Sequence, residues 1–553
     1  MSGNTTSPAI AEACQTALSL ALRDQAADAY DLLEAVAERD ALTDADLRDI
    51  SDAGFLAGRW TGWFARGVTL LRRLLVGVDS PATRGWIVIR MSLLSRDDES
   101  RALRDTALGE FTVAGDDAGQ AMSVLALAFP MHDLLPSAAF RLGLVEAAHQ
   151  VGVQLGDPVT VARALTVRAA LLTYTGEIEE ADTTYRRVIE SFHFGPPMLG
   201  AEVALAALNQ CLAFLSLGRV REIDDVLTRT SHVIDGPRTR NWRALIRGNA
   251  LVLAGQHRRA LRALPPITEP SEEVAAYLEV VRTLAKVEVD RTPPGDDLTQ
   301  VAEFLESRSM QLGSLARAAQ ATLRAVRGEP RPHRDLAPAL HRLIPSRPRF
   351  GWDRAALSLA ELAPAEEAHE ALAPLWDFWP AGPVPAVHRS MVEALLGLRA
   401  PYSSFLEAAD ALEAAGLLPG ASRAMVHASR AAPSGAESLR AHRRALDLLS
   451  RTDAERSIAG LIRARRLRRE PGAPTIPDSQ RHVMNPGLTP REREVVELAA
   501  AGMTGPEIAT RLSISPGTVR NHLQRARDKL GGISKRDLGR LHGGDARAGV
   551  KGP

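Results

Sequence analysis

Apolar residues recur with the 3.6-residue period of an α-helix along most of the chain, from about residue 9 to residue 469. The pattern is clearest at 161–190, where Leu165, Ala169 and Leu172 share one helical face and Gly176 is expected to end the helix. A second helix is predicted to begin near Glu177, and its inner face holds Ala181, Tyr185 and Val188. The stretch therefore predicts two antiparallel helices joined by a short turn.

The same pair recurs further along the chain. Gly218 and Gly255 are each followed, five and nine residues later, by apolar residues: Ile223 and Leu227, then Ala260 and Leu264. This small-residue crossing of two helices resembles a tetratricopeptide repeat, although the glycine-to-glycine steps of 42 and 37 residues exceed the usual 34. We predict an all-α superhelix of stacked helical hairpins, each burying its apolar face on its neighbours. An irregular all-helical domain without true repeats is the alternative.

Proline-rich segments interrupt the helical pattern at 291–297, 328–335, 344–352 and 380–385, where we expect connections between helices. The clearest boundary lies at 470–487, which holds four prolines and has no helical period. We interpret this segment as a flexible linker.

Four parts are therefore expected along the chain. A helical-repeat domain for sensing or interaction occupies 1–469, and the linker follows at 470–487. A separate small domain is predicted at 488–542, and a disordered tail at 543–553.

The small domain has the signals of four short helices. Segments 489–492 and 504–507 each place Thr and Glu three residues apart, with a proline between them, which is the capping-box pattern at a helix start. Residues 513–515 are expected to form a turn, after which Ser515 caps a third helix that begins at Pro516. A fourth helix is predicted from Ser534.

The third helix has two distinct faces. Its inward stripe is Val519, Leu523, Ala526 and Leu530, at steps of four, three and four. At 100° per residue, Asn521 and Gln524 then point away from the core, flanked by four basic residues: Arg520, Arg525, Arg527 and Lys529. Amides can hydrogen-bond to base edges, and guanidinium groups can read guanine or neutralise phosphates.

Charge is concentrated in this region. The whole chain balances 67 basic against 67 acidic residues, which argues against general binding to polyanions. Residues 516–541 nevertheless hold seven basic and two acidic residues, a net charge of +5. A lone basic helix is usually a solvated face, but two short helices, a three-residue turn and a polar third helix are far more specific to DNA binding.

The segment LTPREREVVELAAAGMTGPEIATRLSISPGTVRNHLQRARDKLGGISKRDL resembles the DNA-binding domain of LuxR-type transcription regulators. The resemblance implies that the third helix enters the major groove of promoter DNA and that two domains pair on half-sites. It also implies that Thr518 and Arg525 hold phosphates, whereas Arg520, Asn521 and Gln524 face bases. The expected DNA-binding residues are thus Thr518, Arg520, Asn521, Gln524, Arg525 and Lys529.

The segment departs from the LuxR pattern at two places. Gly505-Pro506 replaces the polar pair that usually starts the second helix, which puts a phosphate contact there in doubt. The fourth helix, which often builds the dimer contact, runs quickly into Gly543-Gly544, so the helical array is the alternative source of dimerisation.

Two parts of the chain also resemble other regulators of transcription. The segment GTVRNHLQRARDKL is also similar to the promoter-reading helix of sigma-factor region four, but the helical array upstream does not fit a sigma factor. The array is similar to the sensor part of the large ATP-binding LuxR-type regulators. This sequence contains no G-x-x-x-x-G-K-[ST] phosphate-binding loop, so we expect the array and the output domain without the ATPase.

The remaining composition supports a regulator rather than an enzyme. Two cysteines, Cys14 and Cys211, exclude a disulfide framework, and neither a signal peptide nor an apolar segment long enough to span a membrane is expected. No nucleophile, base or metal-ligand cluster is recognisable, so no cofactor and no metal are predicted. We expect a cytoplasmic bacterial regulator that forms a homodimer. Its expected partners are promoter DNA, RNA polymerase and an effector (peptide, protein or small molecule). An interaction scaffold is the alternative.

Three further patterns have two interpretations. Aromatic groups at 60–64 and 376–379 fit core packing better than the lining of a ligand groove. The arginine run at 463–469 is either a solvated helix end or an additional contact to phosphates.

Overall fold

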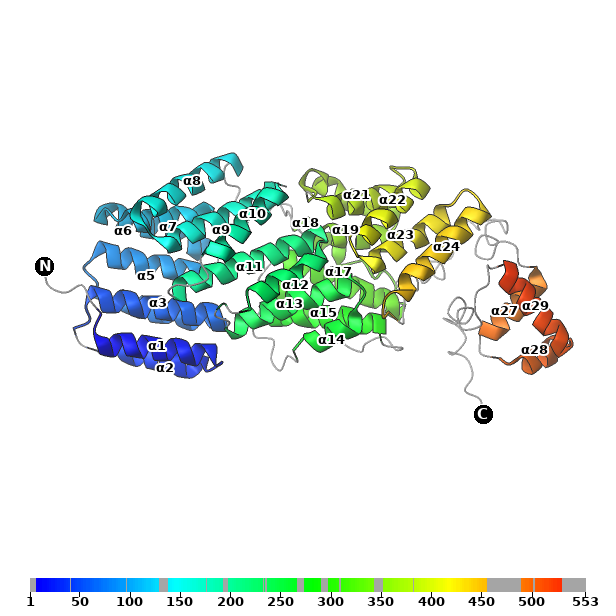
Figure 1. Cartoon of the computed structure of the whole chain (residues 1–553), viewed down its shortest axis with the longest axis horizontal. Coiled ribbons are helices and arrows are strands. Elements are labelled where there is room, and N and C mark those ends of the chain that lie inside the picture. The colour runs from blue at the N-terminus through cyan, green and yellow to red at the C-terminus, as the bar shows by residue number, and fades with distance from the viewer. Residues whose placement is uncertain are drawn as a thin grey trace.

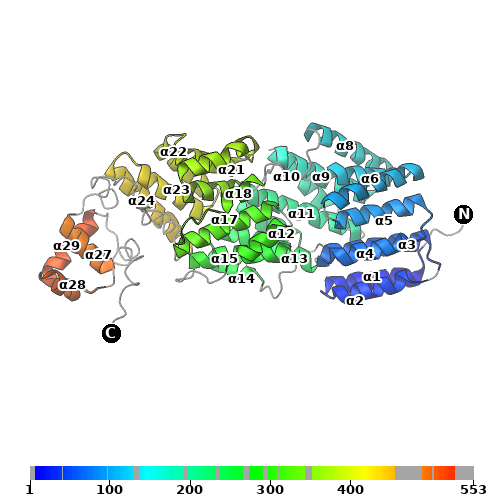
Figure 2. The same ribbon diagram turned by 180° about the vertical axis from the view of Figure 1, so that it is seen from behind.

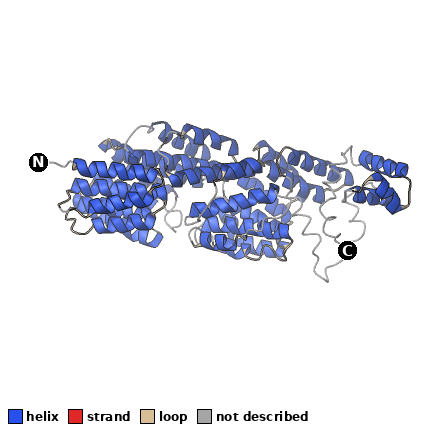
Figure 3. Ribbon diagram, turned by 90° about the horizontal axis from the view of Figure 1, so that it is seen from below, coloured by secondary structure: helices blue, strands red, loops and turns tan. Residues whose placement is uncertain are grey.

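The computed structural model describes residues 6–529 except 40, 96, 129–137, 176, 192–196, 232, 234–235, 266–272, 290–296, 308–309, 343–351, 381, 455–488 and 501–502. Within these residues the secondary structure is helical throughout, and no strand is present (Figure 3). The prediction of an all-α chain is therefore confirmed.

The first part of the array consists of ten helices, labelled as in Figure 1. They are α1 (Pro8–Leu22), α2 (Ala26–Ala37), α3 (Asp44–Thr61), α4 (Phe64–Leu74), α5 (Pro81–Leu94), α6 (Asp97–Ala114), α7 (Asp117–Ala128), α8 (Ala138–Leu155), α9 (Pro158–Thr175) and α10 (Ile178–Ser191).

In its described residues the array continues to residue 450 with fourteen α-helices and one short 3-10 helix. They are α11 (Pro197–Leu217), α12 (Val220–Arg229), α13 (Pro237–Leu253), α14 (His257–Ala263), α15 (Glu273–Val289), α16 (Thr299–Glu306), α17 (Met310–Arg327), α18 (Leu336–His341), α19 (Trp352–Leu362), α20 (Ala365–Leu372), η2 (Ala373–Phe378), α21 (Pro383–Leu395), α22 (Pro401–Ala414), α23 (Leu418–Ala431) and α24 (Gly435–Ser450).

Successive helices of the array pack as antiparallel hairpins. Each helix contacts the next one along the chain and, in most cases, the one after it, as in α9, α10 and α11. The hairpins lie side by side from α1 to α24, and the view from behind shows the same order (Figures 1 and 2). The predicted superhelix of stacked hairpins is thus confirmed, because each hairpin buries its apolar face on both neighbours.

The hairpin turns are built as the glycine positions predict. Gly218 and Gly255 have φ angles of 76° and 78°, in the left-handed region that favours glycine. Behind each glycine the chain closes a Schellman motif, in which the amide of Arg219 donates to the Phe214 carbonyl at 2.8 Å and that of Gln256 donates to the Leu251 carbonyl at 2.8 Å. The third predicted turn residue, Gly176, lies outside the described residues.

The predicted inner faces of these hairpins are buried. They are Leu165, Ala169, Leu172, Ala181, Tyr185, Val188, Ile223, Leu227, Ala260 and Leu264. Most of them belong to one apolar cluster that runs from α9 to α24. Alanine at the crossing points lets the two helices of a hairpin approach closely, and larger side chains such as Tyr185 fill the space beside the crossing.

Consecutive turns of the superhelix touch. Helix α3 contacts α11 and α13, and these two helices in turn contact α21 and α23. The contact at α13 is close: a Cβ atom added to Gly236, directly before α13, would lie 2.4 Å from the Cβ of Trp60 on α3. The array is therefore held together by contacts across its turns as well as between neighbouring hairpins.

The predicted loops agree with the structure in part. Segment 328–335 connects α17 to α18, as expected. Segment 380–385 was expected to be a connection throughout, but Pro383 begins α21, because proline suits the first turn of a helix. Segments 291–297 and 344–352 lie largely outside the described residues, as do the predicted linker and the arginine run.

The aromatic groups differ in their surroundings. Trp376 and Trp379 stack with ring centroids 5.3 Å apart, and Trp379 meets the buried Trp352 edge-on at 4.8 Å. In the first group Trp60 is buried, whereas Trp63 is 43% exposed and stacks on Tyr30. Core packing therefore accounts for the second group, and Trp60 additionally lines a cavity.

Among the described residues one helix, Pro197–Leu215, is long and apolar enough to cross a membrane, so the expectation that no segment has this length and composition was wrong. About 61% of it is buried inside the protein, where it belongs to the main apolar cluster. A core helix of this kind passes the same test, so it is weak evidence for a membrane span.

Candidate nucleic-acid interface

The small C-terminal domain is described through three helices: α27 (Pro490–Ala500), α28 (Gly505–Leu512) and α29 (Pro516–Lys529). Helix α29 packs against both α27 and α28. The apolar cluster between them consists of Val495, Ala499, Ile508, Ala509 and Val519, with Leu498, Met503, Leu512, Ile514 and Leu523 at its edge. A fourth helix was expected from Ser534, which lies outside the described residues.

Two capping boxes fix the starts of the first two helices. The amide of Thr489 donates to Glu492 Oε2 at 2.7 Å, and the amide of Glu492 donates to Thr489 Oγ1 at 3.3 Å. At the second helix, the Thr504 amide donates to Glu507 Oε2 at 2.6 Å and the Thr504 hydroxyl donates to the same oxygen at 2.8 Å. These hydrogen bonds lower the pKa of Glu507, since they favour its charged form. Both predicted capping boxes are confirmed.

The turn between the second and third helices is tight. Ser513 has a φ of 54°, a left-handed conformation that is uncommon for a residue with a side chain. The guanidinium of Arg491 on α27 donates to the Leu512 carbonyl at 2.6 Å and so ties the end of α28 to the start of α27. Together these features set the direction in which α29 leaves the turn.

Ser515 caps α29 as predicted. Its hydroxyl oxygen accepts the amide of Thr518 at 3.0 Å, and the two hydroxyl groups lie 2.8 Å apart. Ile514 and Val519 belong to the same apolar group, as expected for a hydrophobic staple. The start of α29 is therefore held at a fixed angle to the other two helices.

Helix α29 turns its apolar side inward and its polar side to solvent. Val519 and Ala526 are buried, whereas the polar side chains in the same stretch are exposed: Arg520, Asn521, Gln524 and Arg525. Thr518 is half-buried beside Ser515. The side chain of Lys529, although the residue ends α29, lies outside the described part, as do those of Arg527 and Asp528.

The exposed face carries positive charge. Within the described side chains, neither Arg520 nor Arg525 forms an ion pair, whereas Arg491 on α27 pairs with Glu494 at 2.7 Å. The described ranges also contain no group of three His, Cys, Asp or Glu side chains that could hold a metal. What this face offers a partner is thus an alternation of amide groups and unpaired guanidiniums.

Two capped short helices, a three-residue turn and a third helix with exposed amides and guanidiniums define a helix-turn-helix DNA-binding domain. Residues 486–541 match the family described as bacterial regulatory proteins, luxR family. The C-terminal domain of this chain is therefore a helix-turn-helix of the LuxR type.

Curated relatives match the same domain. The spore germination protein GerE of Bacillus subtilis (strain 168) is 56% identical over 46 residues, which are 8% of this chain and 62% of GerE. The probable transcriptional regulatory protein NarL of Mycobacterium tuberculosis is 48% identical over 46 residues, or 21% of its length. The chain thus matches less than two thirds of the length of either relative.

Among the solved structures with low similarity is one that spans most of the chain. A chain of the crystal structure of the APC/C hetero-tetramer Cut9-Hcn1 has 14% identity and a TM-score of 0.34, over 90% of this chain and 96% of that one. Because the TM-score is so low, the architecture of the array rests on its own helices and their contacts.

Sequence reasoning missed two residues that shape the domain. Arg491 resembled a solvated residue of the first turn of α27, but its hydrogen bond to Leu512 joins two helices. Ser513 gave no sign of a left-handed conformation, since glycine or asparagine is the usual signal for it. Glycine at position 513 in related sequences would be a signal for a left-handed conformation of this residue.

Proposed function

We propose that this protein is a transcription regulator that binds promoter DNA in a sequence-specific manner through α29, under the control of the helical array. The observation that carries the proposal is the exposure of Arg520, Asn521, Gln524 and Arg525 on a helix whose other side is anchored by Val519 and Ala526. A helix of this kind fits the major groove, where amides and guanidiniums read base edges.

The six proposed DNA-binding residues have different roles. Asn521 and Gln524 are exposed on α29, and we propose that they hydrogen-bond to bases together with Arg520 beside them. Thr518 and Arg525 are proposed to contact phosphates, and Lys529, at the end of α29, is proposed to add a further phosphate contact. Phosphate contacts orient the domain, and base contacts supply the specificity.

The proposal is tested by selecting DNA sequences with the full chain. Random duplexes are enriched over several rounds, and the affinity of the enriched sequence is compared with that of a shuffled duplex at several salt concentrations. We expect at least a thousandfold preference for the enriched duplex and a log–log salt slope of several units. A chain without salt-dependent affinity for any duplex would instead act as a helical-repeat interaction scaffold.

Regulation by the array, partner choice and assembly belong to the same proposal. The array presents the large surface of a stacked-hairpin superhelix, which suits binding of a protein, peptide or small-molecule effector.

A homodimer is proposed because paired half-sites are the usual targets of such domains, and analytical ultracentrifugation of the full chain tests it. Contact with RNA polymerase, including the sigma-like alternative, is tested by co-purification with and without promoter DNA. The proposed location is the cytoplasm.

A further inference from the structure

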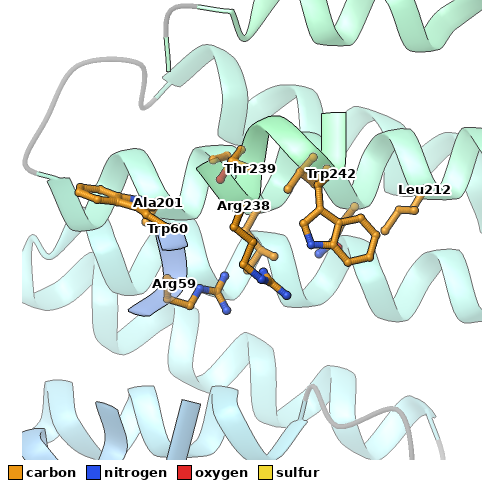
Figure 4. Close-up of a pocket in the computed structure, with 11 residues that line it drawn as sticks. Arg59, Trp60, Ala201, Leu212, Arg238, Thr239 and Trp242 are labelled. Atoms are coloured by element: carbon orange, nitrogen blue, oxygen red, sulfur yellow. The ribbon is translucent and has the colours of Figure 1, made fainter. Parts of the chain in front are cut away.

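A cavity of about 210 Å³ lies where α3 meets α11 and α13, at a contact between two turns of the superhelix. Its polar and aromatic lining comes from all three helices: Arg59 and Trp60 from α3, Asn209 from α11, and Arg238 and Trp242 from α13. Alanine and leucine side chains of α11 form most of the remaining wall. Arg59 and Arg238 extend toward the same space, and the Trp242 indole lies beside Arg238 (Figure 4).

The positive charge of Arg59 is not balanced by a described residue. Arg59 is half-buried, and its side chain forms neither an ion pair nor a hydrogen bond with any described residue. Glu202 is the nearby carboxylate, and it is itself buried and paired with Arg163 at 3.3 Å. Burial, and then the positive charges of Arg238 and Arg163, lower the pKa of Arg59 to about 10, against the opposing effect of Glu202. A bound anion would offset both effects, the burial of the charged guanidinium of Arg59 and its repulsion by the neighbouring arginines.

The guanidinium of Arg59 is the group in this cavity that suits a carboxylate. An arginine donates two parallel N–H bonds to the two oxygens of a carboxylate, so Arg59 supplies both the charge and the directed hydrogen bonds that such a ligand requires.

The rest of the lining selects for an apolar, flat body. Arg238 lies over the rings of Phe64 and Trp242, with 5.0 Å and 5.9 Å from its guanidinium carbon to the ring centroids, so this wall presents aromatic side chains together with the stem of an arginine. An engineered cavity of about 150 Å³ with an aliphatic lining holds benzene. A cavity of about 210 Å³ therefore has room for one aromatic ring with a carboxylate.

We propose that this cavity binds a small aromatic carboxylate, with the carboxylate on Arg59 and the ring among the tryptophan and leucine side chains. Such a ligand joins α3 to α11 and α13 and so stabilises the contact between two turns of the superhelix. Its role as the effector that controls the array rests on the proposed function, whereas its binding to the cavity does not.

A second cavity, of about 450 Å³, is a weaker candidate. It lies along α10, α11 and α12 and is lined by Asp182, Glu222 and Asp225 together with Arg186 and Arg229. These charges already pair with one another or with neighbours: Arg186 with Asp182, and Arg229 with Glu190 at 3.8 Å. Charged side chains that already form ion pairs gain little from binding a charged ligand.

Calorimetric titration of the full chain with benzoate tests the proposal. Benzamide, which has the same shape without the charge, and inorganic phosphate, which has charge without the ring, are titrated for comparison. We expect benzoate to bind at least tenfold more tightly than either compound, because a charge-assisted hydrogen bond and the ring each contribute to binding.

Two variants locate the site. Arg59→Met keeps the aliphatic stem and removes the charge, and we expect benzoate affinity to fall tenfold to a hundredfold. Arg39→Met removes an exposed arginine on the loop after α2 and serves as the control that leaves affinity unchanged. The thermal midpoint of each variant shows whether it remains folded.

Several outcomes overturn the inference. They are a wild-type chain that does not bind benzoate, equal affinity for benzoate and benzamide or phosphate, and a folded Arg59→Met variant with wild-type affinity. DNA affinity is measured separately on the same preparation. A chain that binds benzoate but no DNA refutes the proposed function alone, and a chain that binds DNA but no benzoate refutes this inference alone.

Discussion

The side-chain carboxylate of Asp453 accepts a hydrogen bond from the backbone amide of His257 at 2.6 Å, across 196 positions of the chain. Its second oxygen accepts the amide of Arg258 at 2.8 Å, and the amide of Asp453 donates to the Gly255 carbonyl at 3.0 Å. The end of the array, directly after α24, is thereby fastened to the turn between α13 and α14. In the sequence, Asp453 is the last anchored residue described before the segment that leads to the DNA-binding domain.

Replacing Asp453 by alanine should loosen the end of the array. The side chain acts as an N-cap for α14, although it comes from a distant part of the chain, and losing such a cap costs about 1 kcal/mol. Hydrogen exchange should show faster exchange of the His257 and Arg258 amides. Asp447→Ala, which changes an exposed aspartate on α24, is the matched control. Unchanged protection in the Asp453 variant would show that the fastening contributes little.

Arg520→Ala and Arg525→Ala should have different effects on DNA binding. Because Arg520 is proposed to face bases, its loss should weaken the enriched duplex by about 1–3 kcal/mol and relax specificity at one position. Arg525 is proposed to neutralise a phosphate, so its loss should weaken all duplexes alike and reduce the salt slope by about one. Gel-shift titrations of both variants check this, and unchanged affinity for the enriched duplex in Arg520→Ala would count against the assignment.

Two substitutions in the turn of the helix-turn-helix should change the stability of the domain in opposite directions. Ser513 has a φ of 54°, so Ser513→Gly should stabilise the domain by about 0.5–1 kcal/mol. Ser515→Ala removes the hydroxyl that accepts the Thr518 amide and should destabilise the domain by about 1 kcal/mol. Exchange rates of the α29 amides in the full chain report both effects. Equal rates in the two variants would mean that this turn does not limit the stability of the domain.

A buried carboxyl group makes the stability of the array depend on pH between 4.5 and about 8. Glu288 on α15 is buried, its Oε2 has no hydrogen-bond partner among the described residues, and burial raises its pKa from 4.5 to about 8, against the opposing effect of Arg423. The folded protein therefore holds a proton that the unfolded chain has lost between pH 4.5 and about 8. The free energy of unfolding should fall as the pH rises through this window.

Glu288→Gln should remove this pH dependence. At pH 8 the variant should be more stable than the wild type, by an amount on the order of 3 kcal/mol, while near pH 4.5 the two should be similar. Urea unfolding at pH 5, 6.5 and 8 measures the difference. Glu303→Gln, which changes an exposed residue of α16, should leave the pH profile of the wild type intact. Parallel profiles for Glu288→Gln and wild type would refute the assignment.

Local features of the fold were predictable from the sequence because they depend on neighbouring residues. The capping boxes at Thr489 and Thr504, the left-handed turn at Gly218 and the buried face of Tyr185 all follow from spacings of a few residues. The exposure of Asn521 follows equally from the rotation of 100° per residue along a helix.

Long-range features were not predictable in this way. The contact between Trp60 and Gly236 depends on the rotation that accumulates over several hairpins, and no single spacing encodes it. Arg59 therefore had the appearance of an ordinary residue in the last turn of a helix, and only the neighbouring superhelical turn makes it part of a cavity. The bond from Asp453 to His257 was hidden for the same reason.

Contact between successive turns of the superhelix also limits how the protein can be dissected. In an open solenoid a terminal hairpin can be deleted at the cost of one interface, because each unit meets only its neighbours. Here the removal of α1–α4 would strip α13 of its contact with α3 and leave an apolar face bare in the middle of the molecule. Truncated versions are thus expected to aggregate, and domain-mapping studies should rely on point substitutions within the intact chain.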